Sequence, residues 1–149
     1  MKLLRSLLSL ILFLFFLYWL NGLLLLGVKK ESKVFYDQLK QELEEGDYAP
    51  SFFVLSATRY GWDNGFLNEY GSATKNSKHL SGEAIDIIVL DVNKDGSSNA
   101  EDVDIVFKIL NEKIVKNKGG IGTYKKGSNF LSRQMVHFDC RGYWARWHK

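Results

Sequence analysis

Residues 77–90 read SKHLSGEAIDIIVL and combine a histidine, a glycine and a carboxylate with a run of apolar side chains. The last seven of them, Ala84–Leu90, predict a buried β-strand, because the run is short and rich in β-branched residues. Asp86 lies inside this strand, and burying a lone carboxylate costs several kcal/mol unless a cation or a metal ion binds it. His79 lies seven residues earlier, and Gly82 can make the turn that folds its loop back over the strand.

A second polar pair lies in residues 135–140, MVHFDC, near the C-terminus. A strand has a period of two residues, so His137 and Asp139 are expected on one face, together with Met135. The side chains between them point to the other face. Two polar side chains on one face of a short strand indicate the floor of an active site.

His79, Asp86 and His137 together offer two imidazoles and one carboxylate. Three protein ligands leave a fourth tetrahedral position for water, which is the open arrangement of a catalytic zinc site. Imidazole with carboxylate also suits zinc better than calcium. Two alternatives stay open: either histidine taken singly is more often a loop or core residue than a ligand, and Asp86 taken singly more often forms a salt bridge across the sheet.

Two motifs point to a known family. Residues 77–86, SKHLSGEAID, match the pattern S-x-H-x-x-G-x-A-x-D, and His137-Phe138-Asp139 match its later element, H-x-D or H-x-E. The chain resembles the zinc D-alanyl-D-alanine carboxypeptidase and murein endopeptidase family, which shares its fold with the Hedgehog signalling domain. The resemblance extends from about Lys33 to Trp147. It implies a zinc peptidase that acts on the stem peptides or cross-links of bacterial peptidoglycan.

The resemblance also implies roles for individual residues. The three residues of the predicted zinc site would be its ligands, and Arg59 and Ser77 would bind the peptide carboxylate of the substrate. Arg59 stands in residues 56–60, SATRY, where the family usually has S-G-Y-R-S. Recognition of a carboxylate by a guanidinium requires the arginine itself, so these differences matter little. The alternative for Arg59 is a surface arginine at a strand end.

The general base is less clear. Such a site supports metal-assisted amide hydrolysis, in which zinc polarises the scissile carbonyl and a carboxylate accepts the proton of the attacking water. Many relatives place Glu or Asp three residues before the last histidine, but this chain has Gln134 there. We expect Asp139 to be the general base instead. If Asp139 only orients a ligand histidine, the base is missing.

Residues 91–102, DVNKDGSSNAED, fit the calcium-loop pattern D-x-[DN]-x-[DN]-G-x5-[DE]. A strand precedes this loop in place of the entering helix of an EF-hand, so the loop resembles the dockerin type more closely. Asp102 is shorter than the usual bidentate glutamate, which predicts weak affinity. Alternatively, Asn99 and Asp102 form a capping box for the next helix and residues 91–96 form a solvated turn. The predicted calcium ligands are Asp91, Asn93, Asp95, Asn99 and Asp102.

Residues 1–30 differ sharply from the rest of the chain. They contain 21 apolar residues, four basic residues and no acidic residue, and Ser6–Val28 is free of charge over 23 residues. Because about 20 apolar residues suffice to cross a bilayer, this segment predicts a transmembrane helix that anchors the protein. The alternative is a cleaved signal peptide whose apolar core ends at Asn21-Gly22. The following domain is expected outside the cytoplasm, anchored to the membrane or secreted.

The charge of the chain follows from that segment. The net charge is +3, but residues 31–149 hold 16 basic and 17 acidic residues, which gives no electrostatic case for nucleic-acid binding. With 46% hydrophobic and 25% charged residues the chain is neither disordered nor fibrous. Its single cysteine excludes a disulfide scaffold within the chain.

Residues 31–149 are expected to form one α+β domain with a small antiparallel sheet and flanking helices, because the elements neither alternate as in a βαβ fold nor repeat. Residues 60–78 are polar and predict a long loop. Trp144 and Trp147 are expected either to line a sugar or peptide groove or to pack in the core and at its rim. The expected helices are residues 33–45 and 99–115, and the expected strands are residues 51–56, 84–90, 121–124, 135–140 and 143–147.

Three functions stay open, led by a membrane-anchored zinc metallopeptidase of the bacterial cell wall. The second is a non-catalytic cell-wall or peptide-binding domain that retains zinc. The third is a calcium-dependent adhesion module with a vestigial zinc site. The loops that form the subsites cannot be derived from the sequence, so the choice between carboxypeptidase and endopeptidase, and the peptide bond cleaved, also stay open.

Overall fold

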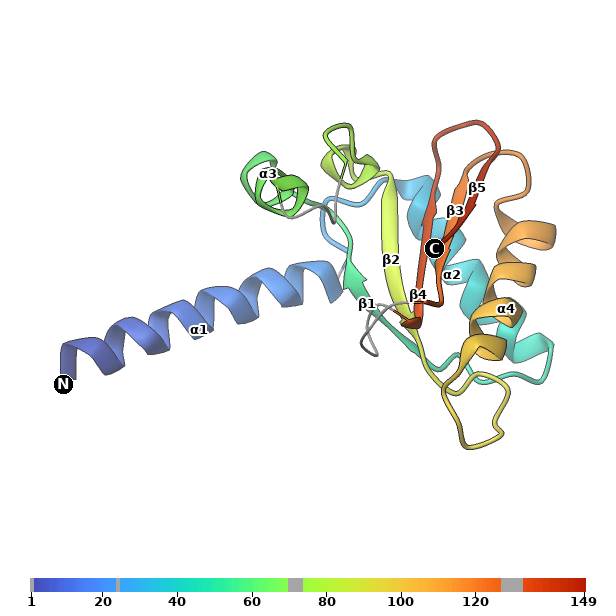
Figure 1. Cartoon of the computed structure of the whole chain (residues 1–149), viewed down its shortest axis with the longest axis horizontal. Coiled ribbons are helices and arrows are strands. Elements are labelled where there is room, and N and C mark those ends of the chain that lie inside the picture. The colour runs from blue at the N-terminus through green and yellow to red at the C-terminus, as the bar shows by residue number, and fades with distance from the viewer. Residues whose placement is uncertain (1, 24, 70–73, 127–132) are drawn as a thin grey trace.

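The computed structural model describes residues 2–23, 25–69, 74–126 and 133–149 (Figure 1). It is a mixed α+β structure, as expected, and includes a short 3₁₀ helix, η1, and a π-helical turn, η2. Its elements in chain order are α1 (Lys2–Leu23), α2 (Lys30–Glu45), β1 (Phe52–Ser56), α3 (Gly61–Glu69), η1 (Lys78–Ser81), β2 (Ala84–Val89), α4 (Ala100–Ile109), η2 (Leu110–Ile114), β3 (Gly120–Tyr124), β4 (Met135–Asp139) and β5 (Ala145–His148).

Five strands form one sheet in the order β1-β2-β4-β3-β5. The pairs β1–β2, β2–β4 and β3–β4 are antiparallel, but β3 and β5 are parallel. The expected antiparallel sheet is therefore present in three of the four pairs, and the prediction is wrong at the edge formed by β5. The reason is geometric: β3 already runs against β4, and the chain reverses after β4, so β5 runs in the same direction as β3 and pairs with its outer edge.

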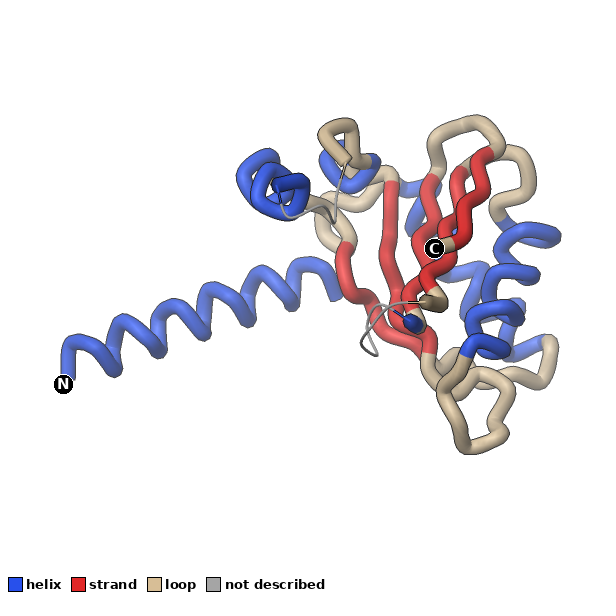
Figure 2. The backbone as a smooth tube through the Cα atoms, in the orientation of Figure 1, coloured by secondary structure: helices blue, strands red, loops and turns tan. Residues whose placement is uncertain are grey.

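Alternation along the strands gives the sheet two different faces. One face is apolar and carries Ile85 and Ile87 of β2 with Phe138 of β4, all fully buried. These side chains form one core with α2 and α4, which lie together on one side of the sheet (Figure 2). Since a strand has a period of two, Asp86 and His137 must point to the opposite face. The apolar core thus determines which side chains are presented for chemistry.

Residues 60–78 were expected to be a loop, and this prediction is wrong in part. Residues Gly61–Glu69 form α3, and residues Lys78–Ser81 form η1. Ser77 caps η1, where its side chain accepts a hydrogen bond from the backbone N–H of His79. Gly82 ends η1 in the left-handed conformation, with φ of 66°, and so makes the expected turn. Residues 70–73 lie outside the described part of the chain.

Helix α1 extends away from the sheet, with the N-terminus at its far end (Figure 1). In the described part of the chain, no helix is both long and apolar enough to span a membrane. The predicted transmembrane helix within residues 1–30 therefore has no support in the structure. The uncharged run Ser6–Val28 does not continue as one helix, because α1 ends at Leu23 and Leu25 is buried in the core of the domain.

Candidate metal centre

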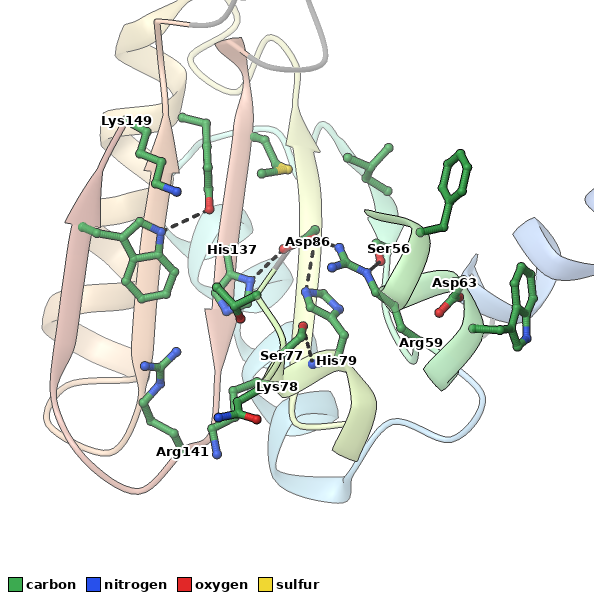
Figure 3. A pocket seen from close by; sticks show the side chains of 18 of the residues that line it. Ser56, Arg59, Asp63, Ser77, Lys78, His79, Asp86, His137, Arg141 and Lys149 are labelled. Carbon is green, nitrogen blue, oxygen red and sulfur yellow. Dashed lines mark hydrogen bonds and ion pairs between the residues drawn. The ribbon is translucent and has the colours of Figure 1, made fainter. Parts of the chain in front are cut away.

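The three predicted zinc ligands meet on the polar face of the sheet. Asp86 and His137 are directly opposite each other on β2 and β4, and His79 reaches the same place from η1 (Figure 3). Nδ1 of His137 lies 2.7 Å from Oδ1 of Asp86, and Nε2 of His79 lies 3.1 Å from Oδ2. All three residues are buried, and they offer one ligand atom each within 4.8 Å of one another. The structure therefore brings together a group that could hold a metal ion.

The far nitrogen of each imidazole is also bonded. Nδ1 of His79 lies 2.5 Å from the carbonyl oxygen of Ala57, and Nε2 of His137 lies 3.0 Å from Oδ2 of Asp139. A carbonyl and a carboxylate accept hydrogen bonds, so these two nitrogens are the ones that donate. With a metal bound, the other nitrogen of each neutral imidazole would be left with a lone pair for the ion beside Asp86. Metal-binding histidines are typically held in this way, with the second nitrogen donating to a carbonyl or a carboxylate.

Without a metal the cluster has another protonation state, in which Nδ1 of His137 donates to Asp86. Burial would raise the pKa of Asp86, but the charge of His79 and the hydrogen bond from His137 outweigh it and hold that pKa well below its usual range. Burial would lower the pKa of His137, but the hydrogen bonds to Asp139 and Asp86 raise it to about 9. Without a metal, a proton on each nitrogen of His137 therefore allows the imidazole to donate to both carboxylates.

Asp139, the predicted general base, is fully buried and surrounded by donors. Besides His137, its carboxylate accepts hydrogen bonds from the backbone N–H of Gly120 at 3.0 Å and from the guanidinium of Arg141 at 2.5 and 2.8 Å. Burial would raise the pKa of Asp139, but the bonds from His137 and Arg141 hold it well below its usual range. These contacts favour the alternative that Asp139 orients the imidazole of His137.

Arg59 and Ser77, the predicted carboxylate-binding residues, both border the same cavity as the cluster. Nη2 of Arg59 is 2.8 Å from Oδ2 of Asp86, and its Nε donates to Oγ of Ser56 at 2.9 Å. The salt bridge expected of a lone Asp86 is therefore present as well, within the cluster. Binding of a substrate carboxylate by Arg59 and Ser77 stays a prediction.

An open cavity of about 1530 Å³ lies over the polar face of the sheet. Among the described residues, Gln134 is not part of its lining, although it is buried, and its backbone carbonyl accepts a hydrogen bond from Val89. One wall is largely apolar and the other is aromatic and basic. The first contains Leu14, Phe15, Leu55, Trp62 and Phe66, and the second contains Tyr124, Arg141, Tyr143, Trp147 and Lys149.

The sequence did not predict Arg141, Tyr124 or Asp63 at the site. The alternation of β4 continues past its end, and this was a usable signal for Arg141, which lies two residues after Asp139. Trp147 was expected either in a groove or in packing, and it lines the cavity. Its indole lies beside His137, with 5.2 Å between the ring centroids.

The predicted calcium loop has the geometry of the alternative interpretation. Asn99 and Asp102 form a capping box at the start of α4. Oδ1 of Asp102 also accepts hydrogen bonds from the backbone N–H groups of Val92 and Asn93, at 2.7 and 3.1 Å. The side chains of Asp91, Asn93 and Asp95 accept hydrogen bonds from backbone N–H groups within the loop. The predicted helix 99–115 is present as α4 and the turn η2.

No family model matches the chain, and no curated protein matches it. The candidate site therefore rests on the motifs and on the geometry around Asp86.

Proposed function

We propose that residues 31–149 form a zinc metallopeptidase that hydrolyses peptide bonds in the stem peptides or cross-links of bacterial peptidoglycan. One observation carries the proposal. Two buried imidazoles and a carboxylate converge beside an open cavity, and an acceptor already holds the far nitrogen of each imidazole. The motif in residues 77–86 supports the choice of this peptidase class.

The donor set fits zinc, with His79, Asp86 and His137 as the residues that would hold it. When bound, zinc would supply a Lewis acid for the scissile carbonyl and an activated water. Arg59 borders the cavity with 11% of its side chain exposed, and we assign to its guanidinium the binding of a substrate carboxylate. Hydrolysis then adds water to the carbonyl carbon, breaks the C–N bond and releases an amine that needs a proton.

A carboxylate must move that proton, and the cavity offers one that the sequence did not suggest. Among the described residues, Asp63 and Asp86 are the only ones with carboxylate side chains in the lining of the cavity. Asp86 would be occupied by the ion. Asp63 lies on α3, across Arg59 from the metal site (Figure 3), and is the residue to which we assign proton transfer.

A second candidate function is a peptide-binding domain that holds the metal and does not cleave. Two observations favour it: the carboxylate of Asp139 is bonded to His137 and Arg141, and Gln134 stands where many members of the family that the chain resembles carry an acid. The two candidates differ in one property. Both bind zinc and stem peptides, but only the peptidase releases products.

The proposed substrate lies outside the cytoplasm, so the proposed function requires that residues 31–149 be exported. Fractionation of cells that express the full chain tests this requirement. Recovery of the chain in the cytoplasmic fraction alone would contradict it.

Calcium at residues 91–102 stays a prediction of the sequence. Calorimetric titration of the metal-free full chain with calcium tests it. Absence of binding at millimolar calcium would leave the capping box as the role of Asn99 and Asp102.

The test of the proposed function is mass spectrometry of purified muropeptides after incubation with the zinc-loaded full chain. We expect a loss of one D-alanine or cleavage of a cross-link, and no product with His79→Ala. Asp63→Asn is expected to keep zinc and lose turnover. His148→Gln is the matched control, because this histidine lies outside the metal cluster and contacts Thr123. Binding without any product, in a chain shown to hold zinc, would select the peptide-binding domain.

A further inference from the structure

The segment between α1 and α2 is built into the domain. Residues 25–29, here called the strap, begin with Leu25, which is 7% exposed and packs in the core. The carbonyl of Leu26 accepts a hydrogen bond from Oγ1 of Thr58 at 3.0 Å. The backbone N–H of Lys29 donates to the carbonyl of Gly82 at 2.8 Å. The strap thus bonds to two separate parts of the chain, near residue 58 and near residue 82.

The segments near residues 58 and 82 both hold residues of the metal site in place. Thr58 lies between Ala57, whose carbonyl holds Nδ1 of His79, and Arg59, which pairs with Asp86. Gly82 ends η1, the short helix that carries His79. The two parts also bond directly, since the backbone N–H of Arg59 donates to the carbonyl of His79 at 3.0 Å. The strap therefore lies across the junction that orients one of the three predicted ligands.

Two glycines allow this close approach. Gly82 has φ of 66°, and a Cβ atom there would overlap the carbonyl oxygen of Gly27. Gly27 has φ of 73°, and a Cβ atom there would lie 3.1 Å from Oγ1 of Thr58. Backbone thus packs on backbone at a distance that side chains would prevent. Lys29 adds an ion pair of 2.6 Å with Glu83, which also pairs with Lys78 of η1.

We propose that the strap is a positioning element of the metal site, which holds residues 57–59 and η1 together so that Nε2 of His79 faces Asp86. The proposal rests on the metal-holding part of the proposed function and does not depend on peptide hydrolysis. A loosened strap lets η1 adopt arrangements in which His79 is turned away. The apparent metal affinity is then the affinity of the competent arrangement multiplied by the fraction of molecules that adopt it.

Lys29 offers a matched pair of substitutions in the full chain. Its φ is −60°, a value that proline adopts, so Lys29→Pro removes the N–H donor to Gly82 without changing that angle. Lys29→Ala removes the ion pair with Glu83 but keeps the N–H. We expect Lys29→Pro to weaken zinc binding about 10- to 100-fold in a chelator competition, and Lys29→Ala to change it less than about threefold.

A second variant tests the proposal independently, in case Lys29→Pro does not fold. Gly27→Ala places a Cβ atom against Thr58, and Gly96→Ala is its control, because Gly96 has φ of 87° but nothing within 4 Å of a Cβ. We expect only Gly27→Ala to weaken zinc binding. Far-ultraviolet circular dichroism verifies that each variant is folded. Unchanged zinc affinity in folded Lys29→Pro and Gly27→Ala would overturn the proposal.

Hydrogen exchange of the metal-free full chain separates this proposal from the proposed function. We expect faster exchange at the backbone N–H groups of Arg59 and Gly82 in Lys29→Pro than in Lys29→Ala, while the core strand β2 keeps its protection. If the unmodified chain binds no zinc, the peptidase proposal fails. Equal exchange in Lys29→Pro and Lys29→Ala would overturn the strap proposal, whether or not the unmodified chain binds zinc.

Discussion

Nε2 of His137 donates a hydrogen bond to Oδ2 of Asp139 at 3.0 Å, between two residues that share one face of β4. The same carboxylate also accepts hydrogen bonds from the guanidinium of Arg141. Without a metal, Nδ1 of His137 donates to Asp86. When a metal replaces that proton, the proton held on Nε2 by Asp139 gives the tautomer in which Nδ1 can bind the ion. This relationship favours a role of Asp139 in orienting His137 over a role as the general base.

The first prediction is that Asp139→Asn weakens zinc binding about 10- to 100-fold, because the imidazole of His137 loses the charge that fixes its orientation. Competition with a chromogenic chelator measures the affinity. Asp104→Asn is the control, since that carboxylate is exposed and forms an ion pair with Lys125, away from the metal cluster. Loss of peptide cleavage with unchanged zinc affinity would show instead that Asp139 is the base.

The second prediction concerns the pH dependence of stability without metal. The pKa of His137 is raised from 6.5 to about 9 in the folded chain, so its contribution to the free energy of unfolding is complete below pH 6.5. That contribution is lost as the pH rises to about 9. The pKa of Asp86 is lowered, so its contribution is present above pH 3.8 and is lost only under more acidic conditions. Urea unfolding in a metal chelator, from pH 5 to about 9.5, measures the curve.

The test is whether the free energy of unfolding falls or rises with pH. Between pH 6.5 and 9 the folded chain binds a proton that the unfolded chain has released, so stability must fall as the pH rises. His137→Gln removes the titrating group, and its stability curve should be flatter over this range. A stability of the unmodified chain that rises across the same range would contradict the protonated arrangement around Asp86.

The third prediction is stabilisation by zinc. At a free zinc concentration 100 times the dissociation constant, the free energy of unfolding should rise by about 2.7 kcal/mol. His79→Gln removes a ligand and should lose most of this rise, whereas His148→Gln should retain it. Urea unfolding with and without zinc measures both. An equal rise in the two variants would mean that zinc binds elsewhere.

The candidate metal site could be predicted largely from the sequence, because two short motifs carry it. His79 and Asp86 lie within one motif, and a charge inside an apolar strand is visible without a structure. The pairing of Asp86 with His137 is not visible, since it depends on the register of β2 against β4. That register is set by core packing of side chains such as Ile85 and Phe138, which a single sequence does not specify.

The errors in the predicted fold have physical causes. Residues Gly61–Glu69 contain two glycines and two asparagines, which disfavour a helix, and yet they form α3. Tertiary contacts override this propensity, as Nδ2 of Asn64 donates to the carbonyl of Thr74. The direction of β5 depends on the path of the whole chain, and its four residues, Ala145–His148, carry no pattern that distinguishes parallel from antiparallel pairing.

The fourth prediction concerns Gly122, which lies between His137 on β4 and Trp147 on β5. A Cβ atom at this position would overlap the indole ring, so the glycine is what allows the indole to lie beside His137. Gly122→Ala must displace either the indole or the strand, which should cost about 1–3 kcal/mol in the free energy of unfolding. Urea unfolding measures the loss, and near-ultraviolet circular dichroism reports the displaced indole.

Gly65→Ala is the matched control for this prediction. Gly65 lies inside α3 with nothing within 4 Å of a Cβ, so alanine should stabilise the chain by about 0.5–1 kcal/mol. Because Trp147 also lines the cavity, Gly122→Ala should raise the KM for a cleaved muropeptide. Its zinc affinity should change less than about threefold, since the bond from His137 to Asp139 is retained. Full stability with an unchanged spectrum would show that the indole does not need this glycine, and the aromatic wall would then be adaptable.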